Sequence, residues 1–203
     1  EVVQEVSADR GTLTYSHDTR GLVTSMTDGR GVVSNYSYDH GGRLISRSFP
    51  SAPAENQSYS YRAAGTSHAG RLAQISDETG TITRSYSKGS LTRERRRIEN
   101  RDYDIDHSFG DQGELKQVRT PGQLIIRYTR DSKLRVTGIT AQRWIKDPET
   151  GTEPPAQTIV SNVQYLPFGP ISSLTYGDGA VQTREFDTSY RLARQLDQLG
   201  GTL

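Results

Sequence analysis

A short phrase that recurs along the chain constrains its fold more than any other feature. The phrase is an aromatic residue, often followed by Asp, and then Gly, a charged residue and Leu; its clearest copy runs from Tyr38 to Leu44 as Tyr-Asp-His-Gly-Gly-Arg-Leu. Weaker copies occupy residues 17–23, 109–115, 128–134 and 186–192, and in every copy the first and last residues lie six positions apart. Such repeats build a fold by placing one supersecondary unit beside the next, so they indicate fold class before any single residue does.

Distorted copies extend the array to eight units, with steps mostly near 18–25 residues. One step is longer, because 40 residues separate Tyr128 from Phe168. The units begin at His17, Tyr38, Tyr61, Tyr86, Phe109, Tyr128, Phe168 and Phe186. The residues assigned to the repeat itself are Tyr38, Asp39, Gly42, Leu44, Phe109, Gly113, Leu115, Tyr128, Asp131, Leu134, Phe168, Leu174, Phe186, Asp187 and Leu192.

Each unit contains two turn signals separated by short alternating runs. The Asp-x-x-Gly element closes one turn, because Asp accepts hydrogen bonds from amides two residues on and Gly adopts positive φ. A second signal follows half a unit later, as at 28–31, 77–80, 120–122 and 177–179. Alternating runs between such clusters are typical of β-hairpins. The sequence therefore predicts an all-β fold of tandem antiparallel hairpins, with the tail at 190–196 as a strand rather than a helix.

Three segments interrupt the regular spacing. The turn at 62–69 is enlarged, and residues 50–54 form a plain loop. The long step predicts a protruding hairpin at about 139–163 that turns at 147–151, with Pro154 and Pro155 keeping its tip irregular. We expect residues 1–203 to be one continuous repeat segment, and the start at Glu1 without Met indicates an internal piece of a longer protein.

Composition excludes several classes of protein. Hydrophobic residues make up only 32% of the chain and mean hydropathy is −0.73, which is thin for a solid globular core. The net charge of +1 gives no general electrostatic reason to bind nucleic acid or a membrane surface. The absence of cysteine excludes a disulfide framework and a thiol nucleophile. The sequence has no run of 18 apolar residues, so no membrane span is predicted.

The predicted strands have no clean apolar face. After residue 43, alternation places Leu44, Ser46 and Ser48 on one face and Ile45, Arg47 and Phe49 on the other. A compact sandwich needs one apolar inward face per strand. The mixed pattern instead favours a sheet wetted on both sides and stabilised by cross-strand pairs.

Two features are candidates for binding. The densest charge cluster contains Arg93, Arg95, Arg96 and Arg97, and it forms either a solvated structural face or a contact with phosphates, acidic glycans or acidic cargo. Nucleic acid would require a broader basic surface than this chain offers. Trp144, the single Trp, lies in the long hairpin and is the candidate contact with cargo or a neighbouring chain, although burial within the hairpin is the alternative.

No catalytic, metal or cofactor site is predicted. Asp104, Asp106 and His107 resemble metal ligands, but the two Asp share a strand face from which His107 points away, and no fourth ligand follows at metal spacing. The four His lie in or near repeat turns, which explains them without catalysis. The tyrosine pairs 36/38 and 59/61 either stack on sugar rings or pack across strands.

The array resembles the Rhs, or YD-repeat, family over about residues 12–196. The segments that carry the resemblance are YSYDHGGRL at 36–44, FGDQGELKQV at 109–118, YTRDSKLRVTGI at 128–139 and YLPFGPISSLTYGDGAVQTREFDTSYRL at 165–192. The last is the most specific, since it joins two consecutive units with the family's spacing. The resemblance implies a β-sheet that spirals into a hollow shell. The chain lacks the Asp-Pro- and Gly-rich segment where family members cleave themselves, so autoproteolysis and toxicity are not assigned to it.

The resemblance also implies a function and partners. In bacterial Rhs toxins and toxin-complex subunits the shell encloses a C-terminal toxin domain, whereas teneurins use a similar shell in adhesion. We therefore expect a non-catalytic shell segment, secreted or at the cell surface. Its partners would be the toxin domain of the same protein, the remaining shell repeats and secretion-system components. The alternative is a cell-surface adhesion or glycan-binding module.

Overall fold

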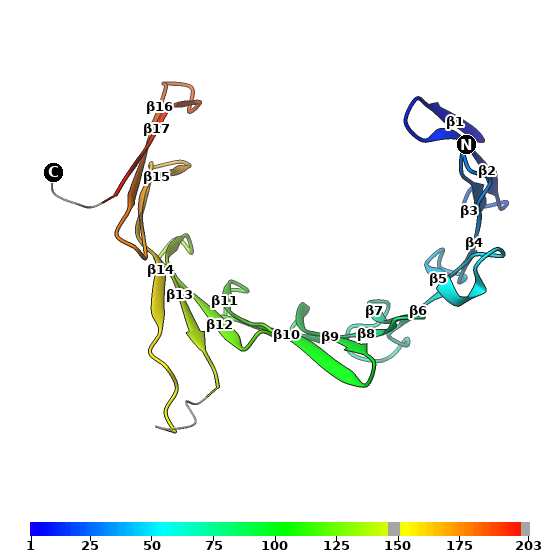
Figure 1. Cartoon of the computed structure of the whole chain (residues 1–203), viewed down its shortest axis with the longest axis horizontal. Coiled ribbons are helices and arrows are strands. Elements are labelled where there is room, and N and C mark those ends of the chain that lie inside the picture. Colours follow the sequence, from blue (N-terminus) through cyan, green and yellow to red (C-terminus); the bar gives the residue numbers. More distant parts are fainter. Residues whose placement is uncertain (146–150, 200–203) are drawn as a thin grey trace. The chain divides into compact units, whose positions relative to one another are not determined.

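The computed structural model describes residues 1–145 and 151–199, and in this part of the chain the regular elements are seventeen β-strands and one short 3₁₀ turn. The all-β prediction is confirmed. Two compact units divide the chain, Glu1–Tyr103 and Asp104–Leu203. Within each unit, successive strands lie side by side in an antiparallel sheet (Figure 1).

The first unit is a meander in which each strand pairs with the next along the chain. Its strands are β1 (Gln4–Ser7), β2 (Gly11–His17), β3 (Val23–Thr27), β4 (Val33–Tyr38), β5 (Leu44–Ser48), β6 (Gln57–Tyr61), β7 (Leu72–Asp77), β8 (Gly80–Ser87) and β9 (Ser90–Ile98). The 3₁₀ turn η1 (Pro53–Glu55) lies between β5 and β6 and overlaps the segment 50–54 that was predicted as a plain loop, so the end of that segment has regular structure.

The second unit repeats the same meander. The strand β10 (Arg101–Phe109) begins in the first unit and ends in the second. The strands that follow are β11 (Leu115–Arg119), β12 (Leu124–Arg130), β13 (Val136–Arg143), β14 (Gln157–Tyr165), β15 (Ile171–Tyr176), β16 (Val181–Phe186) and β17 (Leu192–Gln198). The predicted tail strand is confirmed as β17.

The long step of the repeat separates β13 from β14. These two strands are paired through Ile139 and Val160, as the predicted hairpin requires. Residues 152–156 lead into β14 without regular structure and include Pro154 and Pro155. Of the predicted turn at 147–151, residues 147–150 lie outside the described residues.

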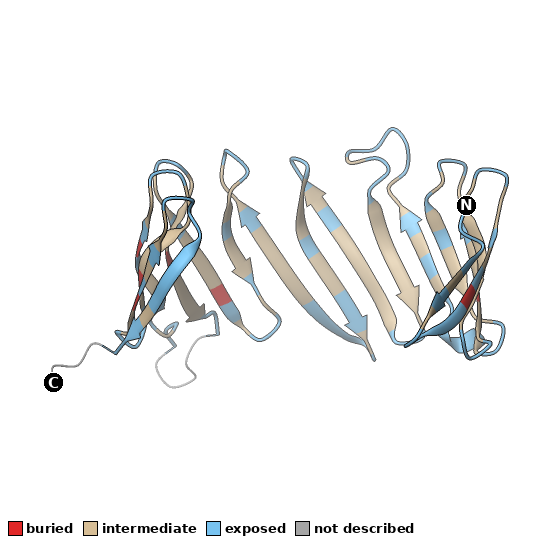
Figure 2. Cartoon of the chain, turned by 90° about the horizontal axis from the view of Figure 1, so that it is seen from above, coloured by how far each residue is buried: buried red, intermediate tan, exposed pale blue. Residues whose placement is uncertain are grey.

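Very few side chains are buried in the described part of the chain. Those that are buried lie scattered along the strands (Figure 2), and they are Leu13, Ile125, Val163 and Leu174 among apolar residues and Ser34 and Gln182 among polar ones. Most strand residues are half-buried, as expected when a single sheet has side chains on both faces and no second layer covers either. Strand pairing, rather than a shared core, therefore carries most of the contacts in each unit.

The two faces of the first unit differ in chemistry. Residues directly opposite each other on paired strands share a face. One row of such partners across β4 to β8 is almost entirely hydroxylated: Ser37, Ser46, Ser58, Ser76 and Thr81. A row on the other face contains Tyr59, Ile75 and Ile82. The mixed pattern in the sequence thus resolves into one small, hydroxyl-rich face and one face of larger side chains.

Candidate functional site

The corner at Tyr38–Leu44 shows how the repeat closes its turn. The Asp39 amide donates to the Arg43 carbonyl at 2.9 Å, and the Gly42 amide donates back to the Asp39 carbonyl at 3.0 Å. Gly42 has φ of +77°, a conformation that costs glycine little. The register shifts by one residue between Ser37 and Tyr38, so the corner is a hairpin turn with a β-bulge.

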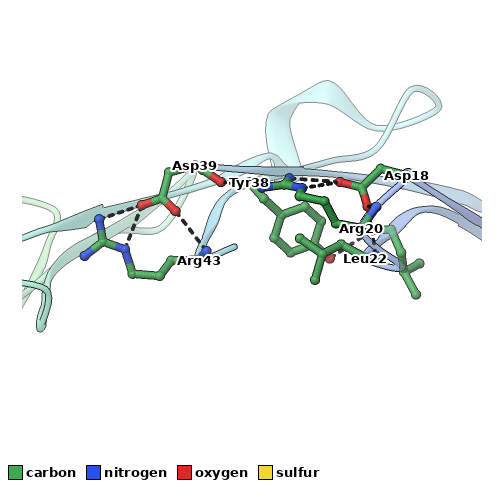
Figure 3. A network of polar contacts seen from close by, with 7 residues as sticks. Asp18, Arg20, Leu22, Tyr38, Asp39 and Arg43 are labelled. Atoms are coloured by element: carbon green, nitrogen blue, oxygen red, sulfur yellow. Dashed lines mark hydrogen bonds and ion pairs between the residues drawn. The ribbon is translucent and has the colours of Figure 1, made fainter. Parts of the chain in front are cut away.

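The Asp39 carboxylate stabilises this corner by accepting two hydrogen bonds from Arg43. One oxygen accepts the Arg43 amide at 2.9 Å and the other accepts Arg43 Nε at 2.7 Å (Figure 3). The Arg43 amide and guanidinium hold the pKa of Asp39 below its ordinary value. The same arrangement joins Asp131 to Arg135 and Asp187 to Arg191.

One corner uses a different carboxylate. At 109–115 the Asp position is Gly110 and the Arg position is Glu114, yet the backbone bonds are the same: Gly110 amide to Glu114 carbonyl at 2.8 Å, and Gly113 amide to Gly110 carbonyl at 3.1 Å. The Glu114 carboxylate occupies the space that a side chain at Gly110 would fill. It accepts the Gln112 amide at 3.1 Å. The corner therefore keeps a carboxylate in place although it comes from the other strand.

A tyrosine hydroxyl links each of four corners to the one before it. Tyr38 donates to the Val23 carbonyl at 2.8 Å (Figure 3). The equivalent bonds run from Tyr61 to Leu44, from Tyr86 to Leu72 and from Tyr165 to Val136, at 2.7–2.8 Å. In each case the acceptor is the first residue of the strand that leaves the previous corner. We call this bond the rung between two corners.

An arginine completes three of these rungs. The Arg43 guanidinium lies over the Tyr61 ring at 4.6 Å from its centroid, Arg71 lies over Tyr86 at 5.2 Å, and Arg135 lies over Tyr165 at 4.5 Å. Each arginine immediately precedes the residue whose carbonyl receives the tyrosine hydroxyl. A cation over an aromatic face at this distance is attractive by about 0.5–1 kcal/mol at exposed sites. In three of the four rungs, therefore, the tyrosine contacts an Arg-apolar pair at the start of the neighbouring strand, whereas at Val23 the preceding residue is Leu22.

Two repeat assignments made from the sequence require correction. In the structure Arg130, not Tyr128, lies opposite Val136, the first residue of the strand that leaves the corner, whereas Tyr128 pairs further along that strand with Ile139. The guanidinium of Arg130 replaces the tyrosine hydroxyl as the donor at this corner, and it donates to the Leu115 carbonyl at 3.1 and 3.3 Å. Leu134, assigned as the closing Leu, instead occupies the position of Gly42 with φ of +63°.

The second correction concerns the unit assigned to Phe168 and Leu174. The corner lies three residues earlier, where Tyr165 pairs with Ile171. Phe168 lies in the turn itself and is 92% exposed, whereas Leu174 is buried in the middle of β15. The remaining assigned residues at 109–115 and 186–192 occupy corner positions, with Phe109 opposite Leu115 and Phe186 opposite Leu192.

The arginine run lies on β9, and at least two of its charges are paired with a carboxylate. Arg95 and Arg97 form ion pairs with Asp102 at 3.2 and 3.6 Å. Glu94 accepts Arg84 Nε at 2.8 Å, and Arg96 donates to Thr79 at 3.4 Å on the opposite face. Arg93, Arg95 and Arg97 lie opposite Ser85, Thr83 and Thr81, so they border the hydroxyl-rich face.

Trp144 lies one residue beyond β13. Its amide donates to the Gln123 carbonyl at 3.0 Å, and the Arg119 guanidinium lies 5.3 Å from the ring centroid. The residue is 37% exposed, so part of its surface faces solvent beside Leu124 of the paired strand, which is 38% exposed. The structure thus places Trp144 at a partly exposed position in the second unit, whereas the arginine run belongs to the first unit.

Neither a metal site nor a membrane-spanning helix is present among the described residues. His, Cys, Asp and Glu side chains form no cluster of three or more that would hold a metal ion within 1–145 and 151–199. In the same ranges no helix has the length and apolar character needed to cross a bilayer. The features that recur from unit to unit are therefore the corners and the rungs.

Antiparallel strands, bulged corners and inter-corner rungs define an all-β protein of tandem hairpins. Residues 17–52 match the family model described as RHS Repeat. This segment therefore carries an RHS repeat.

Solved structures with the same fold are large toxin-complex proteins. The chain matches the Photorhabdus luminescens Tc holotoxin pore with a TM-score of 0.76 and 16% identity, over 98% of this chain and 10% of that one. It matches TcdB2-TccC3 with a TM-score of 0.76 and 17% identity, over 97% of this chain and 11% of that one. This chain thus spans about a tenth of those chains. No curated protein matches it in sequence.

Proposed function

We propose that this chain is a wall segment of an Rhs-type shell that encloses a C-terminal toxin or effector of the same protein, and that its role is containment rather than catalysis. The observation that supports this most directly is the rung. Four tyrosines and Arg130 each tie a hairpin to the one before it by a bond to a backbone carbonyl, which helps a sheet to extend without a buried core. Such a sheet suits a thin wall, and the fold it shares with toxin-complex structures supports the same role.

The hydroxyl-rich face suits a surface that holds cargo without binding it tightly. Large exposed apolar patches are what capture unfolded chains. The row of Ser37, Ser46, Ser58, Ser76 and Thr81 presents short polar side chains instead. Delivery would then require export of the whole protein, with the remaining repeats and secretion-system components as its partners.

Protease protection of the cargo tests this proposal. The protein is the full-length parent that contains this segment, and the measurement is the rate at which a protease digests the C-terminal domain. We expect the domain to resist digestion in the parent. A triple variant, Tyr38→Phe, Tyr61→Phe and Tyr86→Phe, should expose it by removing three rungs, whereas Tyr103→Phe, at an exposed position outside the rungs, should not. A freely digested domain in the unmodified parent would overturn the proposal.

Glycan binding is the second candidate function, and the hydroxyl face bordered by Arg93, Arg95 and Arg97 is the observation that favours it. Hydroxyl and guanidinium groups together suit an acidic glycan. Retention of the chain on a heparin column at low salt, lost in Arg93→Ser, would support this function. Elution in the void volume at low salt would remove it.

A further inference from the structure

The enlarged turn of the first unit closes its corner with the same backbone bonds as the corner at 38–44. The Arg62 amide donates to the Arg71 carbonyl at 2.8 Å, and the Gly70 amide donates back to the Arg62 carbonyl at 2.9 Å. Arg62 therefore occupies the place that Asp39 has at 38–44. This corner carries an arginine at both of its charged positions, where the other has an aspartate and an arginine.

The reversal of charge leaves Arg71 without the counter-ion that its equivalent has. At 38–44 the Asp39 carboxylate accepts both the Arg43 amide and Arg43 Nε. In the enlarged turn the His68 carbonyl accepts the Arg71 amide, at 3.2 Å, so the backbone is satisfied by a neutral group. Among the described residues no carboxylate forms an ion pair with the Arg71 guanidinium, which lies over a tyrosine ring instead.

Two further cations lie beside Arg71. The guanidinium groups of Arg71 and Arg62 lie 5.2 and 6.0 Å from the centroid of the same Tyr86 ring. Arg62 Nη2 donates to the Arg84 carbonyl at 3.4 Å, but its Nε is buried without an acceptor, which is unfavourable for an N–H group. Lys88 follows in the next turn and is exposed. We call Arg62, Arg71 and Lys88 the cation cluster; in the described part of the chain none of the three is paired with a carboxylate.

The enlarged turn is held in place, yet it leaves the cluster open to solvent. His68 Nε2 accepts the Gly89 amide at 3.1 Å, and the imidazole stacks on the Tyr86 ring with centroids 5.9 Å apart. These two contacts fix the turn against the next corner. The other inserted residues, at 63–67 and 69–70, are exposed. An anion from outside the chain can therefore reach a cluster whose backbone is already ordered.

We propose that the cation cluster is a binding site for a carboxylate supplied by an acidic peptide segment. A guanidinium presents N–H donors in a fork that matches a carboxylate, and the buried Arg62 Nε is one donor that lacks an acceptor. Three other corners pair the arginine equivalent to Arg71 with a carboxylate of their own, from Asp39, Asp131 and Asp187. This inference goes beyond the proposed wall function and does not depend on it.

Titration of the ¹⁵N-labelled full chain with an acetylated tetraglutamate amide tests the site, and the tetraglutamine peptide is the uncharged control. We expect saturable shifts of the Arg62 and Arg71 Nε–H signals and of the Lys88 amide with the glutamate peptide only. Raising the salt concentration from about 0.01 M to about 1 M should weaken binding, because exposed charges are screened. The proposal is overturned if these signals do not shift, or if the arginine run on β9 shifts equally.

Single substitutions test whether the two arginines act as the binding groups. Arg62→Gln and Arg71→Gln should each weaken binding about two- to fivefold, as expected for the loss of one exposed ion pair. Arg30→Gln is the matched control, because Arg30 is an exposed arginine of the same unit that is already paired with Asp28 at 2.8 Å. Binding that Arg30→Gln weakens as much as Arg71→Gln does would show a general charge effect and overturn the proposal.

The sharpest variant supplies the carboxylate from within the turn. Arg62→Asp places an aspartate where Asp39 lies in its own corner, so it should pair with Arg71 and abolish peptide binding. It should also unfold at a higher urea concentration than Arg62→Gln, which removes the cation without adding a carboxylate. Retained binding in Arg62→Asp, or a stability below that of Arg62→Gln, would overturn the proposal. None of these outcomes bears on protease protection of the cargo, which tests the wall function separately.

Discussion

The corner at 38–44 in the first unit and the corner at 109–115 in the second make the same turn with differently placed charges. In the first, Asp39 sits before the turn and binds Arg43 after it. In the second, Glu114 sits after the turn and places its carboxylate where the aspartate would be. The difference teaches that the carboxylates of these two corners reach one point in space and that either strand can supply them. The corner at 165–171 makes the same backbone bonds with Leu166 and Pro170 in the two charged positions, so the carboxylate stabilises the turn without being required for it.

The left-handed position should show the largest effect. Gly42→Val forces a β-branched residue to φ of +77°, which costs about 1–3 kcal/mol, whereas Leu134→Gly relieves the same conformation at +63°. We expect the first change to lower the free energy of unfolding and the second to raise it by less than about 1 kcal/mol, because glycine loses more entropy on folding. Urea unfolding measures both. If both variants changed the free energy of unfolding in the same direction, the positive φ at this position would not be what limits the choice of residue.

The carboxylates should show the next largest effect. Asp39→Ala removes the acceptor of the Arg43 amide and its charge-assisted partner, and we expect it to lower the free energy of unfolding more than the loss of Glu114 does. Glu114→Ala removes the longer bond to the Gln112 amide and a 3.9 Å ion pair with Lys116, and it should cost about 0.5 kcal/mol. Chemical denaturation of both variants gives the ratio. A larger loss at Glu114 would reverse the comparison.

Exchange of the two charge arrangements should have a small net effect. The double variant Gly110→Asp with Glu114→Arg rebuilds the first corner in the second unit, and we expect its free energy of unfolding to lie within about 0.5 kcal/mol of the parent. Gly110→Asp alone should be worse than the double variant, because its carboxylate meets that of Glu114. Thermal unfolding of the three proteins tests this coupling, which would be absent if the single and double variants were alike.

Low pH should destabilise the protein by a small amount at each corner that contains an aspartate. The pKa of Asp39 is lowered by the Arg43 amide and guanidinium, and that of Asp187 by the same groups of Arg191. A carboxyl whose folded pKa is depressed stabilises the protein above its unfolded pKa of about 3.9 and loses that stabilisation as pH falls through the folded value. We expect stability to decline below about pH 4, less steeply in Asp39→Asn than in the parent. Identical acid profiles would contradict this.

Fold class was predictable because turn chemistry and strand alternation are local. The corner register at 128–134 was not, since Tyr128 and Leu134 have the same six-residue separation as the true pair, Arg130 and Val136. The position of Asp was the usable signal: Asp131 directly follows Arg130, as Asp39 follows Tyr38. Likewise, Gly169 lies four residues after Tyr165, as Gly42 lies four residues after Tyr38, and this spacing identifies the corner that the aromatic Phe168 obscured.

The candidate binding residues depended on partners that sequence position does not reveal. The charge row at Arg95 and Arg97 could be placed on one face by alternation, but its compensation by Asp102 depends on which strand lies beside β9. The rungs were missed because the tyrosine hydroxyl and its carbonyl acceptor lie 14 to 29 residues apart. Only strand pairing brings such groups within hydrogen-bond distance.

The rungs have a consequence for how such a protein changes over time. Each hairpin contacts its two neighbours and shares no core with the rest, so its stability is approximately a sum of local and nearest-neighbour contributions. Damage to one corner then weakens one joint and leaves distant hairpins intact. Units can accordingly be gained or lost one at a time, provided that each newcomer presents a tyrosine on one side and an Arg-apolar pair on the other.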